Sequence, residues 1–108
     1  MIYELRIYHA VPGKLPLLLK RFETITLKFW EKHGIRQVGF WTTMIGESNN
    51  DVYYILEWND LNERVQKWNA FQNDPDWIKQ KAETEKEGPL TASITNLILT
   101  PTGFSTLK

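Results

Sequence analysis

Cysteine is missing from this chain of 108 residues. Its absence excludes disulfide bonds, thiolate nucleophiles, zinc–thiolate sites and ligation of haem through a thiolate. A chain without cysteine fits a reducing compartment. The stretch MIYELRIYHA at the start also lacks the basic residues and the long apolar core of a secretory signal peptide. We therefore expect a cytoplasmic protein.

Long apolar runs and an excess of one charge are also absent. No stretch approaches the roughly 20 apolar residues that a membrane-spanning helix needs. Basic and acidic side chains number 13 each, so the formal net charge is zero. Nucleic-acid binding requires a concentrated basic surface, and the sequence contains no basic block. We expect neither a membrane span nor a nucleic-acid partner.

Histidine is scarce, with only His9 and His33. A helix predicted between them covers about 19 residues and would be roughly 28 Å long, so the two side chains should lie near opposite ends of the molecule. They cannot share a metal within one subunit, and we expect no metal and no cofactor. Both are interpreted as structural. The alternative is a base or a single haem ligand, for which His33 is better placed because a helix end favours its charged form.

Aromatic residues, by contrast, make up 13% of the chain and include five tryptophans. They concentrate in residues 52–58, a predicted strand. Because both faces of this strand are largely apolar, we expect it to be central and covered on both sides. A chain of this length forms one domain, residues 1–108, whose own helices cover one face only. A second copy of the chain is predicted to cover the other face.

Apolar periodicity predicts the remaining elements. Strands are expected at residues 2–10, 35–45, 52–58 and 90–100, and helices at residues 15–33, 61–71 and 75–87. Asp60 and Asp74 are predicted N-caps, and Gly34 is predicted to end the first helix. The order β-α-β-β-α-β predicts an α+β ferredoxin-like plait. Its four-stranded antiparallel sheet should have strands one and three in the middle and helices on one face.

The first strand presents two different faces. One carries Tyr3, Leu5, Ile7 and His9, and we interpret it as the core face. The other carries Ile2, Glu4, Arg6 and Tyr8, a mixture of charged and apolar groups that suits an interface better than bulk water. With one aromatic face of residues 52–58, this second face predicts face-to-face dimerisation into a dimeric α+β barrel.

Glu4, Arg6 and Glu57 form one polar constellation, because they could meet on one sheet face if the register allows. Two interpretations stay open: a buried ion network that sets the registry of the dimer, or a polar patch that orients a carboxylate or enolate in a cavity. Arg64 lies beside two acidic residues in a predicted first helical turn. A local salt bridge is the simpler interpretation of this residue, and contact with an anion is the alternative.

Tryptophans at strand and helix spacing belong to the core, or else they form the wall of a pocket for a flat apolar ligand. No catalytic residue is assigned. The candidate pocket residues are Glu4, Arg6, Tyr8, His33, Trp41, Glu57, Trp58, Arg64, Trp68 and Trp77.

Several short motifs occur in order along the chain. They are YELRIY (3–8), PGK (12–14), GFW (39–41), IG (45–46), YILEW (54–58), ER (63–64), the pair Trp68 and Phe71, DPDW (74–77) and TPTGFS (100–105). No single motif is specific, but the ordered set resembles the NIPSNAP family over essentially the whole chain. The resemblance implies a dimeric α+β barrel, in agreement with the pattern of strands and helices.

The function implied by this resemblance is poorly defined. Related barrels include cofactor-independent monooxygenases, small isomerases and haem-using enzymes, but a fold does not transfer its function. One hypothesis is a homodimer that binds, or acts on, a small, partly apolar or aromatic molecule in a cavity between sheet and helices. A cofactor-independent monooxygenase is its most specific form. The other hypothesis is a non-enzymatic structural or protein-interaction module. An open pocket of roughly 300 Å³ or more favours the first.

Overall fold

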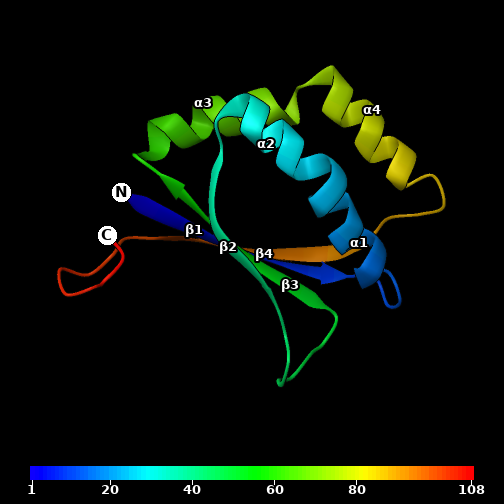
Figure 1. The fold of residues 1–108 in the computed structure, drawn as a ribbon, viewed down its shortest axis with the longest axis horizontal. Coiled ribbons are helices and arrows are strands. Elements are labelled where there is room, and N and C mark those ends of the chain that lie inside the picture. The colour runs from blue at the N-terminus through cyan, green and yellow to red at the C-terminus, as the bar shows by residue number, and fades with distance from the viewer.

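The computed structural model describes residues 1–108 as one antiparallel sheet with helices on one side (Figure 1). The strands are β1 (Ile2–Ala10), β2 (Arg36–Thr42), β3 (Asp51–Trp58) and β4 (Thr91–Leu99). Their order in the sheet is β2-β3-β1-β4, and every neighbouring pair is antiparallel. The predicted plait, with β1 and β3 in the middle, is therefore confirmed.

The first helical segment runs without a break through α1 (Leu15–Arg21), the π-helical turn η1 (Phe22–Thr26) and α2 (Leu27–His33). It has the bounds that the sequence predicts, and Gly34 ends it with a φ of 71°, the left-handed conformation that glycine adopts without strain. The π-helical turn was not predicted. Such a turn holds an extra residue, so it changes which side chains face the sheet.

The second helical segment consists of α3 (Leu61–Gln72) and α4 (Pro75–Thr84). Both predicted N-caps are confirmed: Asp60 accepts a hydrogen bond from the Glu63 N–H at 2.8 Å, and Asp74 accepts one from the Asp76 N–H at 3.0 Å. α4 ends at Thr84 rather than at residue 87, as the chain turns toward Gly88 at a φ of 117°. None of the helices combines the length and the apolar character needed to cross a membrane.

The face of β1 that meets the helices is the opposite of the predicted one. Arg6 lies opposite Tyr54 in the register, and its guanidinium lies 4.7 Å from the centre of the Trp68 ring on α3. Tyr8, on the same face, packs edge-on against Phe22 at 5.2 Å. The prediction was wrong because it kept the charged residues out of the core. The open face carries instead Tyr3, Leu5, Ile7 and His9.

Aromatic rings fill the space between sheet and helices. Trp30 of α2 lies at the centre of this layer, with the rings of Phe22, Phe40, Tyr54, Trp68 and Phe71 within 5.2–6.4 Å of its own. From β3, the side chains of Val52, Tyr54, Leu56 and Trp58 are fully buried beneath the helices. The predicted central position of this strand is thus confirmed, and its helix-facing side is covered as expected.

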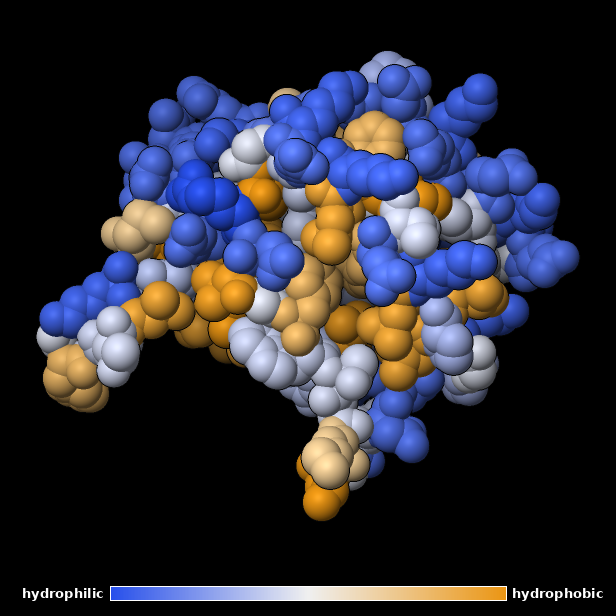
Figure 2. All heavy atoms as spheres, viewed as in Figure 1, coloured by the Kyte–Doolittle hydropathy of each residue, from blue (hydrophilic) through white to orange (hydrophobic).

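The other face of the sheet is uncovered in the single chain. Figure 2 shows hydrophilic residues over the helices and more hydrophobic ones along the underside, between the C-terminal tail and the hairpin that joins β2 to β3. Trp41, Leu97 and Leu99 are large apolar side chains exposed on this open face. At the tip of the hairpin, Met44 and Ile45 are 95% and 93% exposed. A substantial apolar surface therefore has no partner within the chain.

Candidate functional site

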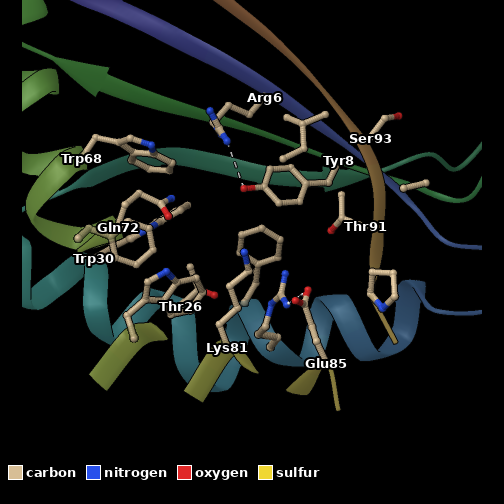
Figure 3. Close-up of a pocket in the computed structure, with 17 residues that line it drawn as sticks. Arg6, Tyr8, Thr26, Trp30, Trp68, Gln72, Lys81, Glu85, Thr91 and Ser93 are labelled. Carbon is tan, nitrogen blue, oxygen red and sulfur yellow. Dashed lines mark hydrogen bonds and ion pairs between the residues drawn. The ribbon is translucent and has the colours of Figure 1, made fainter. Parts of the chain in front are cut away.

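A cavity of about 470 Å³ lies between the sheet and the helices (Figure 3). β1 and β4 form one wall, and the two helical segments form the other. The wall includes Arg6, Tyr8, Trp30, Trp68, Trp77 and Lys81. About half of the residues that line it are hydrophobic, so the cavity combines apolar walls with a small number of polar groups.

The π-helical turn borders this cavity directly. Its first and last residues, Phe22 and Thr26, are both buried and both line the wall. The Phe22 ring packs edge-on against the rings of Tyr8 and Tyr54 at 5.2 and 5.4 Å. Single π-helical turns inside α-helices occur frequently at functional sites. The irregular turn therefore forms part of the cavity wall.

Arg6 is the main polar group of the cavity and is almost fully buried. Its Nε donates to the Tyr54 hydroxyl at 2.7 Å, its Nη1 to Glu4 at 3.1 Å and its Nη2 to the Tyr8 hydroxyl at 3.3 Å. Burial lowers the pKa of Arg6, but the oxygens of Tyr54, Tyr8 and Glu4 more than offset this and raise the pKa above its usual value. The guanidinium is therefore always charged.

Glu4 lies behind Arg6, with no exposed surface. Besides the bond from Arg6, Oε1 accepts hydrogen bonds from Trp58 Nε1 at 3.0 Å and Arg64 Nε at 2.8 Å, and Oε2 accepts one from Arg64 Nη2 at 2.9 Å. Burial raises the pKa of Glu4, but the bonds from Arg64 and Trp58 bring it below its usual value. Two guanidinium groups thus share one ionised carboxylate, and this cluster keeps one surplus positive charge.

The mouth of the cavity adds further charge. Arg21 is paired with Glu85, at 2.9 Å between Nη1 and Oε2. Lys81 takes part in none of the ion pairs of the chain, and Figure 3 shows it reaching from α4 toward the space beside Tyr8. Among the lining residues, three cations face one carboxylate, a surplus of two positive charges in a protein whose net charge is zero.

Two polar atoms in residues of the cavity wall lack a hydrogen-bond partner. They are the indole Nε1 of Trp30 and the hydroxyl Oγ1 of Thr91, both buried. An unsatisfied buried polar group costs about 1–3 kcal/mol. Few such groups are found in native proteins, so each one requires an explanation. Both atoms belong to residues that line one cavity, although the atoms themselves are enclosed by the surrounding side chains.

Nine of the ten predicted pocket residues fall into three groups. Arg6, Tyr8, Trp68 and Trp77 line the cavity, and Glu4, Trp58 and Arg64 lie in the layer behind Arg6. Glu57 and Trp41 are on the open face. The register pairs Glu57 with Tyr3, so it does not join Glu4 and Arg6 as the sequence suggested. It bonds instead to Arg36, at 3.3 Å between Oε1 and Nε.

His33 lies away from the cavity, where α2 meets the start of α4. Its Nε2 and Lys32 Nζ each lie 2.8 Å from Asp74 Oδ2. The bonds from Lys32 and His33 hold the pKa of Asp74 well below its usual range. These contacts tie the two helical segments together. No three His, Asp or Glu side chains are arranged so that they could hold a metal ion.

Arg64 also departs from the simpler expectation. It does not pair with the acidic residues of its own helical turn, since it binds Glu4 across the layer. The carboxylate of its neighbour Glu63 is bound instead by Arg36 at 3.2 Å and Lys67 at 2.8 Å. The local salt bridge predicted for Arg64 is therefore wrong: Glu4 offers Arg64 both carboxylate oxygens in a bidentate pair, while Glu63 is already bound by two other cations.

Sequence reasoning missed the part of the cavity wall that the first helical segment provides. The sequence predicts an apolar stripe on the first helix through Phe22, Ile25 and Phe29, widened by Thr26, and this stripe omits Trp30. Each residue turns an α-helix by about 100°, so the extra residue of the π-helical turn rotates the following residues toward the sheet. The spacing of four from Phe22 to Thr26 to Trp30 was the available signal.

Solved structures of bacterial proteins share this architecture. The protein Atu4242 from Agrobacterium tumefaciens is 27% identical, with both chains covered in full and a TM-score of 0.86. An uncharacterised NIPSNAP domain protein from Burkholderia xenovorans is 25% identical, with 97% of this chain and 98% of that chain covered and a TM-score of 0.83. At 14% identity, a Chloroflexus aurantiacus protein classed with antibiotic biosynthesis monooxygenases still reaches a TM-score of 0.59 with both chains covered in full, which shows a shared fold.

The sequence comparisons agree with the structural ones. No curated protein matches the chain. The model of the NIPSNAP family, in contrast, matches residues 3–106, which is nearly the whole sequence and extends over all the strands and helices except the first residue of β1. The resemblance carried by the ordered motifs is thereby confirmed, and the chain belongs to the NIPSNAP family.

Proposed function

We propose that this protein is a homodimer that binds, or acts on, a small, partly apolar or aromatic molecule in the cavity between its sheet and its helices. The cavity itself carries the proposal. Its volume of about 470 Å³ falls within the range of small-molecule sites. The rings of Trp68 and Trp77 suit a flat apolar group, while Arg6 and Tyr8 supply the small number of polar contacts that fix an orientation.

The open face of the sheet supports the homodimer. A second copy packed face to face would cover the apolar side chains of β1, β3 and β4. The projecting hairpin, with Met44 and Ile45 at its tip, extends beyond the sheet and is suited to contact a neighbouring subunit. Large exposed apolar patches mark such interfaces, and two-fold symmetric dimers are the commonest soluble oligomers. Arg6 faces the helices, so Arg6→Ala is not expected to weaken this dimer directly.

Native mass spectrometry of gently purified protein tests both parts of the proposal. We expect a mass of two chains, with a small-molecule adduct that is released on denaturation. Tryptophan fluorescence should change when the adduct is removed, since Trp30, Trp68 and Trp77 line the cavity. A monomer without an adduct, and without a fluorescence response to any flat aromatic compound, would contradict the proposal.

A cofactor-independent monooxygenase is the most specific form of this function. It is favoured by the fold shared with the Chloroflexus aurantiacus protein and by donors on Arg6 and Tyr8 that suit the oxyanion of a hydroxyaromatic substrate. Oxygen uptake with a panel of hydroxyaromatic compounds tests it. If the protein binds these compounds and consumes no oxygen, the monooxygenase hypothesis fails, and binding or isomerisation is left as its function. The non-enzymatic interaction module becomes the better account if the cavity binds nothing.

A further inference from the structure

We propose that the molecule bound in the cavity is a carboxylate, held by Arg6 and Tyr8 with its flat apolar part against the tryptophans. This inference rests on the proposed function and names the chemical class of the ligand. It is carried by three observations: the hydrogen-bond donors left over on Arg6, the direction of the Tyr8 hydroxyl proton, and the surplus of positive charge at the cavity.

The first observation is that Arg6 has more donors than partners. A guanidinium carries five N–H donors and no acceptor. Three of the donors of Arg6 are used, one each for Tyr54, Glu4 and Tyr8. One N–H on Nη1 and one on Nη2 are left, on a side chain that is nine-tenths buried and lines the cavity. Two N–H groups on the two terminal nitrogens of one guanidinium can serve the two oxygens of a carboxylate.

The second observation concerns the proton of Tyr8. Burial holds the pKa of Tyr54 well above its usual value, so its hydroxyl keeps its proton. The Tyr54 oxygen accepts from Arg6, and its proton goes to the Tyr8 oxygen at 3.2 Å. That oxygen also accepts from Nη2 of Arg6. The Tyr8 oxygen therefore accepts two hydrogen bonds, and the Tyr54 oxygen is already used by Arg6. The O–H of Tyr8 has no acceptor in the chain, so it is a third free donor at the cavity.

The third observation is electrostatic. The Glu4 carboxylate is shared between Arg6 and Arg64, so one buried positive charge has no counterion. A buried charge is costly unless it is paired. A monoanion in the cavity supplies the missing partner, and the unpaired Lys81 at the mouth attracts it. The two free N–H groups of Arg6 and the O–H of Tyr8 all require an acceptor, and they lie next to a surplus positive charge. A cationic ligand, or a neutral ligand that can only donate hydrogen bonds, should therefore bind poorly.

Three matched probes test this inference: 2-naphthoate, its neutral isostere 2-naphthamide, and 2-naphthylamine. Titration followed by calorimetry or tryptophan fluorescence should show that the wild-type protein binds 2-naphthoate at least about tenfold more tightly than the amide, because hydrogen bonds between charged partners are stronger than those to a neutral acceptor. The amine should bind no better than the amide. Affinity for the carboxylate should also fall with increasing salt, because Lys81 is near solvent.

Variants distinguish a specific site from general attraction. Tyr8→Phe should weaken 2-naphthoate binding about tenfold and leave 2-naphthamide almost unchanged. Lys81→Gln should weaken it less, and the matched control Lys79→Gln, on the exposed side of the same helix, should have no effect. Equal affinity for the carboxylate and the amide would overturn the inference and leave the proposed function intact. If the folded protein binds none of the probes, the aromatic ligand site itself is contradicted, and the proposed function fails with it.

Discussion

Arg64 binds both carboxylate oxygens of Glu4, at 2.8 and 2.9 Å, although the two residues are 60 positions apart in the sequence. This bidentate pair connects β1 to α3 in the interior of the protein. Arg6 binds the same carboxylate at 3.1 Å from within β1. The floor of the cavity is therefore held in place by an ion cluster rather than by apolar packing alone, and its orientation depends on a single buried carboxylate.

Replacing this carboxylate should be costly. Glu4→Gln leaves Arg6 and Arg64 buried without a negative partner, and breaking a buried ion pair in this way costs about 3–5 kcal/mol. Denaturation by urea, followed by tryptophan fluorescence and circular dichroism, measures the change in the free energy of unfolding. Glu57→Gln is the matched control, because Glu57 is 29% exposed and pairs with Arg36 on the open face. This control should cost less than about 1 kcal/mol. A similar loss for both variants would contradict the central role of Glu4.

Stability at low pH should depend on Glu63. The hydrogen bonds from Arg36, Lys67 and the Asn59 N–H lower the pKa of this carboxyl group to about 2 from its ordinary 4.5. A lowered pKa stabilises the folded state at pH values above 4.5, and the contribution is lost as the pH falls toward 2. Because Arg36 and Lys67 are partly exposed, solvent screening limits the contribution to about 1 kcal/mol.

The variant Glu63→Gln isolates this contribution. It should be about 1 kcal/mol less stable than the wild-type protein at pH 7, and the difference should shrink as the pH falls toward 2, because the wild-type carboxyl group becomes protonated around that pH. Unfolding curves at closely spaced pH values provide the comparison. The substitution keeps the backbone N–H that Asp60 caps, so the helix start is preserved. A difference that persists unchanged to pH 2 would mean that Glu63 acts through packing and not through its charge.

Local pattern was sufficient to predict much of the fold. Strict alternation defines β1 with its correct bounds, and short polar side chains before Leu61 and Pro75 identify the N-caps. The cavity between sheet and helices and four of its lining residues also follow from the sequence. These features depend on residues close together in the chain, or on the fixed topology of the plait.

Long-range pairing was not predictable in the same way. Alternation separates the two faces of β1 but does not state which one is inside. Glu4 is unsuited to a core until Trp58 and Arg64, more than fifty positions away, supply its partners, and Arg6 depends in the same way on the hydroxyl of Tyr54, 48 positions away. The π-helical turn is marked only by the spacing of four from Phe22 to Thr26 to Trp30, since nothing in the composition of residues 22–26 indicates an extra residue. The inverted face of β1 and the missed π-helical turn both concern the direction of side chains, and this direction decides which residues line the cavity.

The proposed dimer predicts a contrast between two exposed apolar residues. Leu97 on the open face of β4 is 42% exposed, and Ile78 on α4 is 53% exposed. Leu97→Lys should weaken dimerisation at least about tenfold, because it places a charge in the apolar interface. Ile78→Lys, on the helical side, should leave the dimer unchanged. Analytical ultracentrifugation over a range of concentrations compares them. Equal effects of the two substitutions would place the interface elsewhere.

The two most buried tryptophans of the cavity region provide a last comparison. Trp58 donates its indole N–H to Glu4 at 3.0 Å, whereas the indole N–H of Trp30 has no partner. Substitution by phenylalanine removes similar volumes from similarly buried positions. Trp58→Phe also removes a hydrogen bond to a charged acceptor, whereas Trp30→Phe removes an unsatisfied donor. We therefore expect Trp30→Phe to be the less destabilising variant by about 2 kcal/mol or more in ligand-free protein.

The same comparison, made with ligand present, tests what the Trp30 donor is for. If a bound molecule accepts a hydrogen bond from this indole, then Trp30→Phe weakens binding while it spares the stability of the free protein. If the donor is satisfied by water in the cavity, the two tryptophan variants lose similar stability and the affinity of Trp30→Phe is unchanged. Denaturation curves with and without 2-naphthoate distinguish these outcomes, because a ligand that binds only the folded state adds stability in proportion to the logarithm of its concentration over Kd. Unequal stability combined with weakened binding would show that this buried donor serves the ligand at the expense of the fold.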